Sequence, residues 1–337
     1  MIELKTPRGL AVKVPEDLSE DPTPRFSLAD AQAAREYYLA HGYVIFESLY
    51  PAPTCDTIRR LWDEQVKPYP GYIYRQTSSG EAETHVKNAA GWIMNPILNL
   101  QSIDPRRFRA FRDFSTRGIL AHKPLTQVFT ALLAEAPKIV QSMYFEGNSA
   151  TWEHQDSYYL DSEVIGEMCA AWIALEDIAA RAGRFFICPG SHKIKLEDHS
   201  LHNNIAVNHE AYIRSVVDQI RARDLEISAP VLHKGDVLLW NSLTIHGSLD
   251  TQDPSRSRSS ITCHAIPRSR RFLQLQTRLL TLATDEVNGT AIYRPKDLAV
   301  LKNRVVFFIE THFPRMFYWL KKQAILYFVR QKTAAAT

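Results

Sequence analysis

The sequence lacks several features that would place it in a special class of protein. Its 337 residues include only four cysteines, and none forms a C-x-x-C pair, so neither a zinc ribbon nor a redox dithiol is indicated. Nowhere are there about 18 consecutive apolar residues, and the first residues contain no apolar run of signal-peptide length. We therefore expect a protein without a membrane-spanning segment, located in a reducing cytoplasm.

The sequence also lacks an excess of charge of either sign. It has 40 Lys and Arg against 37 Asp and Glu, a formal net charge of +3, so whole-protein electrostatics predicts no nucleic-acid partner. With 45% hydrophobic and 23% charged residues, the composition is that of an ordinary globular protein rather than a disordered or collagen-like chain. A chain of this length can bury roughly 75% of its unfolded surface, so a large core is available.

The first part of the chain predicts an irregular arm followed by alternating helices and loops. Residues 1–25 carry four prolines among charged residues and are interpreted as irregular. The S-x-x-D pattern at Ser27 predicts the start of a helix that ends at His41-Gly42, before a strand over 43–46. Further helices are predicted over 53–66, 108–114 and 125–133, and long loops that could lie over a site are predicted over 69–102.

Beyond residue 139 the pattern changes to short apolar runs separated by glycine and proline turns. Many short strands of this kind favour an antiparallel sandwich or jelly roll over a βαβ fold. A loop and a helix over 210–223 interrupt them. We predict a mainly β domain over 26–297, with a helical N-terminal part and an insertion near 194–228. Its strands are expected at 140–145, 169–175, 184–188, 237–240 and 261–266.

The last segment, residues 298–337, is a basic and aromatic tail in which Glu310 is the only acid. Pro314 is expected to split it into two helices. Two interpretations stay open. The tail could be an amphipathic helix that docks on the sheet, or basic and aromatic residues could place it at a membrane interface.

The candidate chemistry starts from an H-x-D pair. Residues two apart on a strand point to the same face, so His154 and Asp156 can chelate one metal ion. His246, which follows the strand predicted over 237–240, is the best candidate for a third ligand. Two histidines and one carboxylate on one face of an ion form the arrangement typical of non-heme Fe(II) oxygenases.

The order and spacing of five motifs resemble the phytanoyl-CoA dioxygenase family. The resemblance covers about residues 139–267, with a further likeness at Gly42-Tyr43-Val44-Ile45. It implies a double-stranded β-helix, that is, a cupin-like jelly roll, which binds Fe(II) and uses 2-oxoglutarate and O2 as co-substrates. The five motifs are His154-Gln155-Asp156-Ser157-Tyr158-Tyr159, Ala171-Trp172-Ile173-Ala174-Leu175-Glu176-Asp177, Gly183, Pro189-Gly190-Ser191-His192-Lys193, and Gly235-Asp236-Val237 leading to His246-Gly247-Ser248.

Carried over position by position, the resemblance implies that His154, Asp156 and His246 are the iron ligands. Because Asp156 retains the carboxylate that related halogenases lack, hydroxylation, desaturation or ring closure is favoured over halogenation. His264 lies on the strand expected over 261–266 and is interpreted as a packed, hydrogen-bonded histidine.

The resemblance also implies a site for 2-oxoglutarate. Arg258 matches the family's 2-oxoglutarate arginine, whose planar fork can pair with a carboxylate. It lies twelve residues after the distal histidine rather than eleven, which leaves Arg256 as a substitute. Ser248 and Trp172 match positions that line the co-substrate pocket in relatives.

The substrate is predicted only by class. Tyr158, Tyr159 and the loops that carry Arg75 and Lys87 are expected to form pocket walls. The predicted function is hydroxylation of a small-molecule or lipid-linked substrate, with release of succinate and carbon dioxide. A catalytically silent jelly-roll binding protein, or a desaturase or cyclase with the same iron centre, is the alternative. The sequence leaves the oligomeric state open, and peripheral membrane contact through the tail remains a possibility.

Overall fold

The N-terminal helices form where the sequence predicts them. The computed structural model describes residues 1–76, 81–194 and 205–323. Ser27 and Asp30 form a capping box ahead of helix α1 (Ala31–His41), which ends at Gly42 with a φ of 78°. Strand β4 (Tyr43–Phe46) follows directly. The other predicted helices are α2 (Ala52–Leu61), which continues as a π-turn through Val66, α3 (Arg109–Phe114) and α4 (Lys123–Leu133).

The prediction that residues 1–25 form an irregular arm is wrong. Strands β1 (Ile2–Lys5) and β2 (Ala11–Val14) pair as an antiparallel hairpin. Val12 and Val14 alternate with exposed residues and are buried in a cluster with Phe186. The prolines of this segment favour irregular structure, but burial of the strand face that carries the two valines stabilises the hairpin more strongly.

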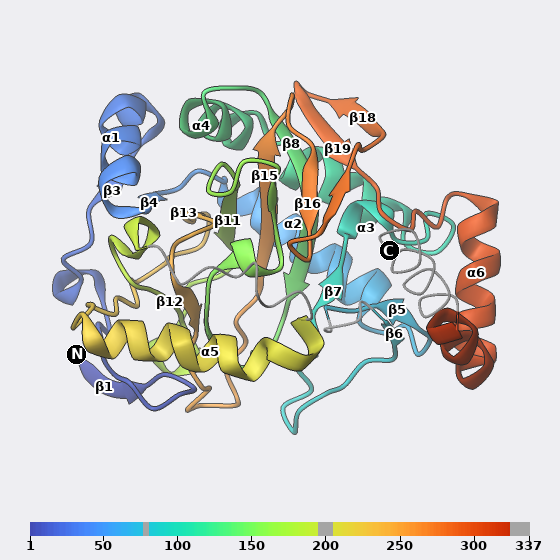
Figure 1. Cartoon of the computed structure of the whole chain (residues 1–337), viewed down its shortest axis with the longest axis horizontal. Coiled ribbons are helices and arrows are strands. Elements are labelled where there is room, and N and C mark those ends of the chain that lie inside the picture. The colour runs from blue at the N-terminus through green and yellow to red at the C-terminus, as the bar shows by residue number, and fades with distance from the viewer. Residues whose placement is uncertain (77–80, 195–204, 324–337) are drawn as a thin grey trace, which may run out of the picture.

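Two sheets face each other to form the predicted jelly roll (Figure 1). In the described part of the chain, the larger sheet has nine strands: β18 (Thr284–Val287), β19 (Thr290–Tyr293), β8 (Pro137–Phe145), β15 (Ser260–Pro267), β11 (Cys169–Ala174), β13 (Val237–Asn241), β4 and β3 (Arg25–Phe26) in that order, with β7 (Ile97–Leu98) paired to β8. The smaller sheet has the order β12 (Phe185–Ile187), β14 (His246–Ser248) and β9 (Thr151–His154). The remaining strands are β10 (Leu160–Ser162), β16 (Phe272–Gln274) and β17 (Arg278–Leu280) in one sheet, and β5 (Ile73–Tyr74) and β6 (Ala82–Glu83) in another.

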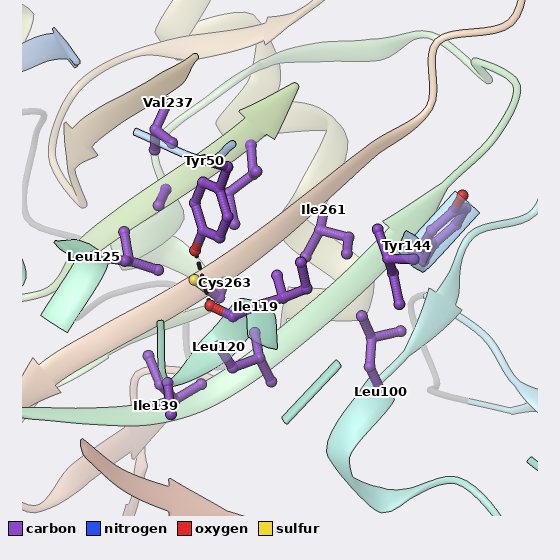
Figure 2. Close-up of a cluster of buried hydrophobic side chains, with 14 of the residues drawn as sticks. Tyr50, Leu100, Ile119, Leu120, Leu125, Ile139, Tyr144, Val237, Ile261 and Cys263 are labelled. Atoms are coloured by element: carbon purple, nitrogen blue, oxygen red, sulfur yellow. Dashed lines mark hydrogen bonds between the residues drawn. The ribbon is translucent and has the colours of Figure 1, made fainter. Parts of the chain in front are cut away.

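One face of the larger sheet packs against the N-terminal helices. Because side chains alternate along a strand, Ile173, Val237 and Ile261 all point toward this layer, where they are fully buried. Figure 2 shows this core, including Tyr50, whose hydroxyl donates to the carbonyl oxygen of Ile119 at 2.8 Å. The helices thus make one side of the sheet rigid.

The opposite face of the larger sheet points toward the smaller sheet. Trp172 on β11 and Trp240 on β13 lie on this face, in a cluster with Phe185 of β12. Register fixes their neighbours, since Trp172 pairs with Leu238 on one side and Thr262 on the other. The space between the two sheets is therefore lined from both sides, and it contains the candidate site.

The tight turn before β13 depends on Gly235. Its φ is 92°, and a Cβ built on it would lie 2.2 Å from the carbonyl oxygen of Tyr50. We expect Gly235→Ala to lower the free energy of unfolding by about 2–4 kcal/mol, because a strained φ and a backbone clash act together. Denaturant unfolding measures the loss. Gly9→Ala is the matched control, since Gly9 also has a positive φ but meets nothing within 4 Å, so it should cost only about 1 kcal/mol. Equal losses would contradict the clash.

The later helices also follow the predicted pattern. Helix α5 (Ile205–Ala222) begins five residues before the helix predicted over 210–223 and ends one residue before its predicted end; the loop predicted before it lies largely outside the described residues. Helix α6 (Leu301–His312) has Phe313 as its C-cap, and a second helix begins at Pro314 and continues to residue 323, where this described range stops, as the proline predicts. Within the described residues, no helix is both long and apolar enough to cross a membrane. The domain boundaries at 25 and 297 stay predictions.

Candidate metal centre and active site

The three candidate ligands converge at one point between the sheets. Strand β9 ends at His154, which pairs across the ladder with His246, the first residue of β14. Asp156 follows β9 in a short 3₁₀ turn rather than on the strand itself. Its Oδ1 lies 3.7 Å from Nε2 of His154 and 3.6 Å from Nε2 of His246. The three ligand atoms all lie within 4.8 Å of one another, and all three residues are buried, so together they could hold a metal ion.

Hydrogen bonds set both imidazole rings in the orientation that ligation needs. Nδ1 of His154 lies 2.8 Å from the carbonyl oxygen of Trp152, and Nδ1 of His246 lies 2.9 Å from that of Thr244. Because a carbonyl only accepts, each Nδ1 carries a proton, and in a neutral ring Nε2 is then the atom with the free lone pair. Both Nε2 atoms face Asp156.

Burial and neighbouring charges favour the protonation states of a metal-binding site. Burial, together with the nearby His246, lowers the pKa of His154, which keeps its imidazole neutral. Burial alone would raise the pKa of Asp156, but His246 and His264 hold it well below its usual range. The carboxylate is therefore ionised beside a neutral ligand.

Two residues hold the other oxygen of Asp156. Nε1 of Trp240 donates to Oδ2 at 2.8 Å, and Nε2 of His264 lies 3.4 Å from the same atom. Oδ1 is thereby left to face the two histidines. Sequence reasoning did not identify Trp240 and interpreted His264 only as a packed residue. The alternation along 237–240 and 261–266 shows which residues share a face, but only the register of β13 and β15 against β11 brings them to Asp156.

Loss of the Trp240 donor is expected to weaken metal binding without removing a ligand. We expect Trp240→Phe to raise the dissociation constant for Fe(II) by about 10- to 100-fold, the usual cost of losing a hydrogen bond that orients a ligand. Anaerobic metal titration without 2-oxoglutarate measures it. Trp172→Phe is the matched control, because Trp172 lines the same cavity. If the two variants bound iron equally well, the Nε1 bond would have no role in ligation.

Arg258 lies in the same cavity and has no anionic partner among the described residues. Its side chain is only 2% exposed, and Nη1 donates to the carbonyl oxygen of Gly183 at 3.1 Å. Nε has no hydrogen-bond partner, and the guanidinium lies 5.3 Å from the ring of Phe145 and 5.8 Å from that of Trp172. Burial lowers the pKa of Arg258 to about 9. A buried guanidinium without a carboxylate is a site for an anionic ligand.

The cavity joins the metal candidates to Arg258. Ser248 and Trp172 line it, and their contact with the co-substrate stays a prediction. Ser248 Oγ accepts from the backbone of Thr151 at 2.9 Å and donates to Oδ1 of Asn148 at 3.1 Å. The Ser248 hydroxyl thus donates its hydrogen bond to Asn148, and by accepting from Thr151 it helps to fix the position of β9. The other lining residues are Gln76, Met143, Phe145, Thr151, His154, Asp156, Phe185, Trp240, His246, Gly247, Arg258, Thr262 and His264.

The expectation that Arg75 and Lys87 form pocket walls is not met. Arg75 is fully buried, and its guanidinium lies 2.9 Å from the carbonyl oxygen of Asn95 and 2.7 Å from Nδ1 of His85, so it holds the loops together. Lys87 is exposed, and neither residue lines the cavity. The residue from that loop which does line the cavity is Gln76.

The two tyrosines after the H-x-D pair have different positions. Tyr158 is buried and stacks on Tyr212 of α5, with ring centroids 3.7 Å apart, so it fixes that helix rather than lining the cavity. The ring of Tyr159 lies 5.7 Å from that of His154, and its hydroxyl lies 2.7 Å from Nε2 of His209. Like Tyr158, Tyr159 is not among the residues that line the cavity, so its contact with a substrate stays a prediction.

A jelly roll with two histidines and an aspartate between its sheets defines a class of metal-binding protein. Comparison with known protein families places the chain in this class. The model of the phytanoyl-CoA dioxygenase family (PhyH) matches residues 38–258. The chain belongs to this family. Phytanoyl-CoA dioxygenase domain-containing protein 1 of Bos taurus is 31% identical over 257 residues, which cover 66% of this chain and 85% of that protein.

Two solved structures support the fold. The non-heme alpha ketoglutarate dependent carbocyclase SnoK has a TM-score of 0.55 and covers 76% of this chain and 91% of its own. The epimerase SnoN, solved with Fe3+, alpha ketoglutarate and nogalamycin RO, has a TM-score of 0.51 and covers 80% of this chain and 97% of its own. At 15% identity each, they confirm the predicted fold, and SnoN contains the predicted metal and co-substrate.

Proposed function

We propose that the protein is an Fe(II)- and 2-oxoglutarate-dependent dioxygenase that hydroxylates a small-molecule or lipid-linked substrate. The observation that carries this proposal is that one cavity holds three candidate metal ligands together with a buried guanidinium that has no carboxylate partner among the described residues. Membership of the phytanoyl-CoA dioxygenase family supports it.

The donor set fits iron, and the cavity fits the co-substrate. His154 and His246 would bind Fe(II) through Nε2, and Asp156 through Oδ1, which is the facial set that leaves positions open for other ligands. Arg258 would pair with the distal carboxylate of 2-oxoglutarate through the nitrogens that the Gly183 carbonyl leaves free. When bound, Fe(II) supplies the redox chemistry that couples conversion of 2-oxoglutarate and dioxygen to succinate and carbon dioxide with oxidation of a substrate C–H bond.

The protein's own residues orient the ligands and exclude water. Trp240 and His264 hold one oxygen of Asp156 and thereby direct the other. The rings of Trp172, Phe185 and Phe145 line the cavity, so an ion pair formed with Arg258 is shielded from solvent. The choice between hydroxylation, desaturation and ring closure depends on where the substrate C–H bond lies relative to the iron.

Anaerobic titration of Fe(II) and 2-oxoglutarate into the metal-free protein tests the proposal. A chelated 2-oxo acid gives a weak visible charge-transfer band. We expect the band in the wild type, its loss in His154→Ala, and succinate release once both a substrate and dioxygen are supplied. A folded protein that gives no band would instead support a silent jelly-roll binding protein. A band with desaturated or cyclised product would correct the reaction but keep the iron centre.

A further inference from the structure

The helices of the tail expose apolar side chains on their outer surface. We define the C-terminal helix pair as residues 301–323, which contain α6 and the helix that follows Pro314. On α6, Leu301, Val305 and Phe308 are spaced by four and three residues, so they form one stripe. Their exposed fractions are 65%, 50% and 53%. Among residues 1–76, 81–194 and 205–323, no layer covers these large side chains.

The apolar surface continues after α6. Phe313, Met316, Trp319 and Leu320 have exposed fractions of 53%, 49%, 59% and 50%. A run of exposed large apolar residues across two successive helices differs from the single exposed residues that are normal on a protein surface. Such a surface marks an interaction site.

The C-terminal helix pair buries its negative charge and carries positive charges on its other side chains. Glu310, the single acid in residues 301–323, is 4% exposed. It accepts hydrogen bonds from the hydroxyl groups of Tyr74 at 3.0 Å and Tyr318 at 2.8 Å. The basic residues of the pair are Lys302, Arg304, Arg315, Lys321 and Lys322. The outer surface therefore combines apolar and cationic side chains, with no carboxylate among them.

Contacts to the β5–β6 loops fix the position of the pair. The ring of Phe307 meets that of Tyr74 edge-on, with centroids 5.1 Å apart, and the Tyr74 hydroxyl donates to Glu310 of the pair. Tyr74 is two residues before Gln76, which lines the active-site cavity. In Figure 1, α6 lies at one edge of the molecule, and α1 and β1 lie at the opposite edge. The helix pair is thus attached beside a loop of the candidate active site and faces outward.

We propose that the C-terminal helix pair binds the surface of an anionic lipid bilayer. Basic side chains attract anionic headgroups, and exposed Phe, Leu, Met and Trp side chains can insert at the boundary between headgroups and acyl chains. A second copy of the chain is disfavoured as the partner of this surface, because the basic side chains of the two helix pairs would then repel each other. The inference concerns where the protein works and does not depend on its iron chemistry, although it favours a lipid-linked substrate over a free polar one.

Co-sedimentation of the full chain with vesicles tests the proposal. We expect binding to vesicles of phosphatidylcholine mixed with phosphatidylserine and much weaker binding to phosphatidylcholine alone. Leu320→Glu should weaken binding to the mixed vesicles. Leu39→Glu is its matched control, because Leu39 lies on α1 with a similar exposed fraction of 49%. The Leu39→Glu variant should bind the vesicles as the wild type does.

A second pair of variants tests the charges. Lys321→Glu with Lys322→Glu should weaken partitioning at least about tenfold, since each basic residue near an anionic surface contributes strongly to binding. Lys5→Glu with Lys13→Glu changes the net charge equally on the exposed face of the β1–β2 hairpin and should have much less effect. Failure of the wild type to bind mixed vesicles, or equal binding by both double variants, would overturn the proposal. A dimer that Leu320→Glu dissociates would overturn it in favour of self-association. Fe(II) titration of the same samples reports separately on the proposed enzyme function.

Discussion

Replacement of Asp156 by alanine is expected to weaken Fe(II) binding by more than about 100-fold and to abolish turnover. Loss of a residue that merely orients a ligand costs about 10- to 100-fold, and Asp156 supplies a ligand atom itself. Its Oδ1 lies at nearly equal distances from Nε2 of His154 and His246, so it is the atom that completes the set. Two histidines alone bind a divalent ion weakly because the site loses both an oxygen donor and its negative charge.

Anaerobic Fe(II) titration checks this expectation, with circular dichroism to confirm folding. The matched control is Glu153→Gln, because Glu153 is also fully buried and precedes His154 on β9, yet it does not belong to the ligand cluster. It should bind iron like the wild type. If Asp156→Ala retained wild-type affinity, or if Glu153→Gln lost it, the ligand assignment would be wrong.

The metal candidates were predictable because their chemistry is partly local. Two ligands separated by one residue need only a short extended segment. The third, His246, was chosen because it follows a predicted strand in the β-rich region, and the resemblance to a family supported that choice. The reason given for the pair was only partly right, since β9 ends at His154 and Asp156 lies in the turn beyond it. The turn still directs Asp156 inward, because the backbone of Ser157 donates to that of Ser242 at 3.1 Å.

The residues that support the ligands were not predictable in the same way. Trp240 and His264 come from strands on opposite sides of β11, and each reaches Asp156 only through the register of that sheet. Register depends on side-chain packing between segments far apart in sequence. Apolar alternation gives the face on which a residue lies but not its neighbours across the sheet.

Charged residues in loops were the least predictable. Arg75 and Lys87 both looked suited to binding an acidic substrate, but Arg75 binds carbonyl groups of its own loops and Lys87 points to solvent. The same type of side chain at 258 lies in the cavity because the residue precedes β15 and its guanidinium reaches Gly183. Only the tertiary contacts distinguish an arginine that holds loops together from one that is available to bind a ligand.

Arg258→Ala is expected to lower the affinity for 2-oxoglutarate by about 30-fold or more, because loss of one partner of a buried, hydrogen-bonded charge pair costs about 2–5 kcal/mol. Affinity is measured from the charge-transfer band at saturating Fe(II). Arg256→Ala is the control, since the Arg256 side chain is 66% exposed and does not line the cavity. It should leave the affinity unchanged, and a loss there with none at Arg258 would reassign the co-substrate arginine.

A purely structural role for Arg258 predicts a different result in the protein without ligands. In the absence of an anion, its guanidinium is buried, and among the described residues one carbonyl accepts from it and nothing accepts from Nε, which disfavours the folded state. Arg258→Ala should therefore keep or raise the free energy of unfolding of the ligand-free protein while it removes 2-oxoglutarate binding. Arg258→Lys should restore only part of that binding, because an ammonium group retains the charge but cannot form the paired hydrogen bonds of a guanidinium. If instead Arg258→Ala lost stability and affinity together, and lysine restored both, the side chain would act through packing rather than through recognition of a carboxylate.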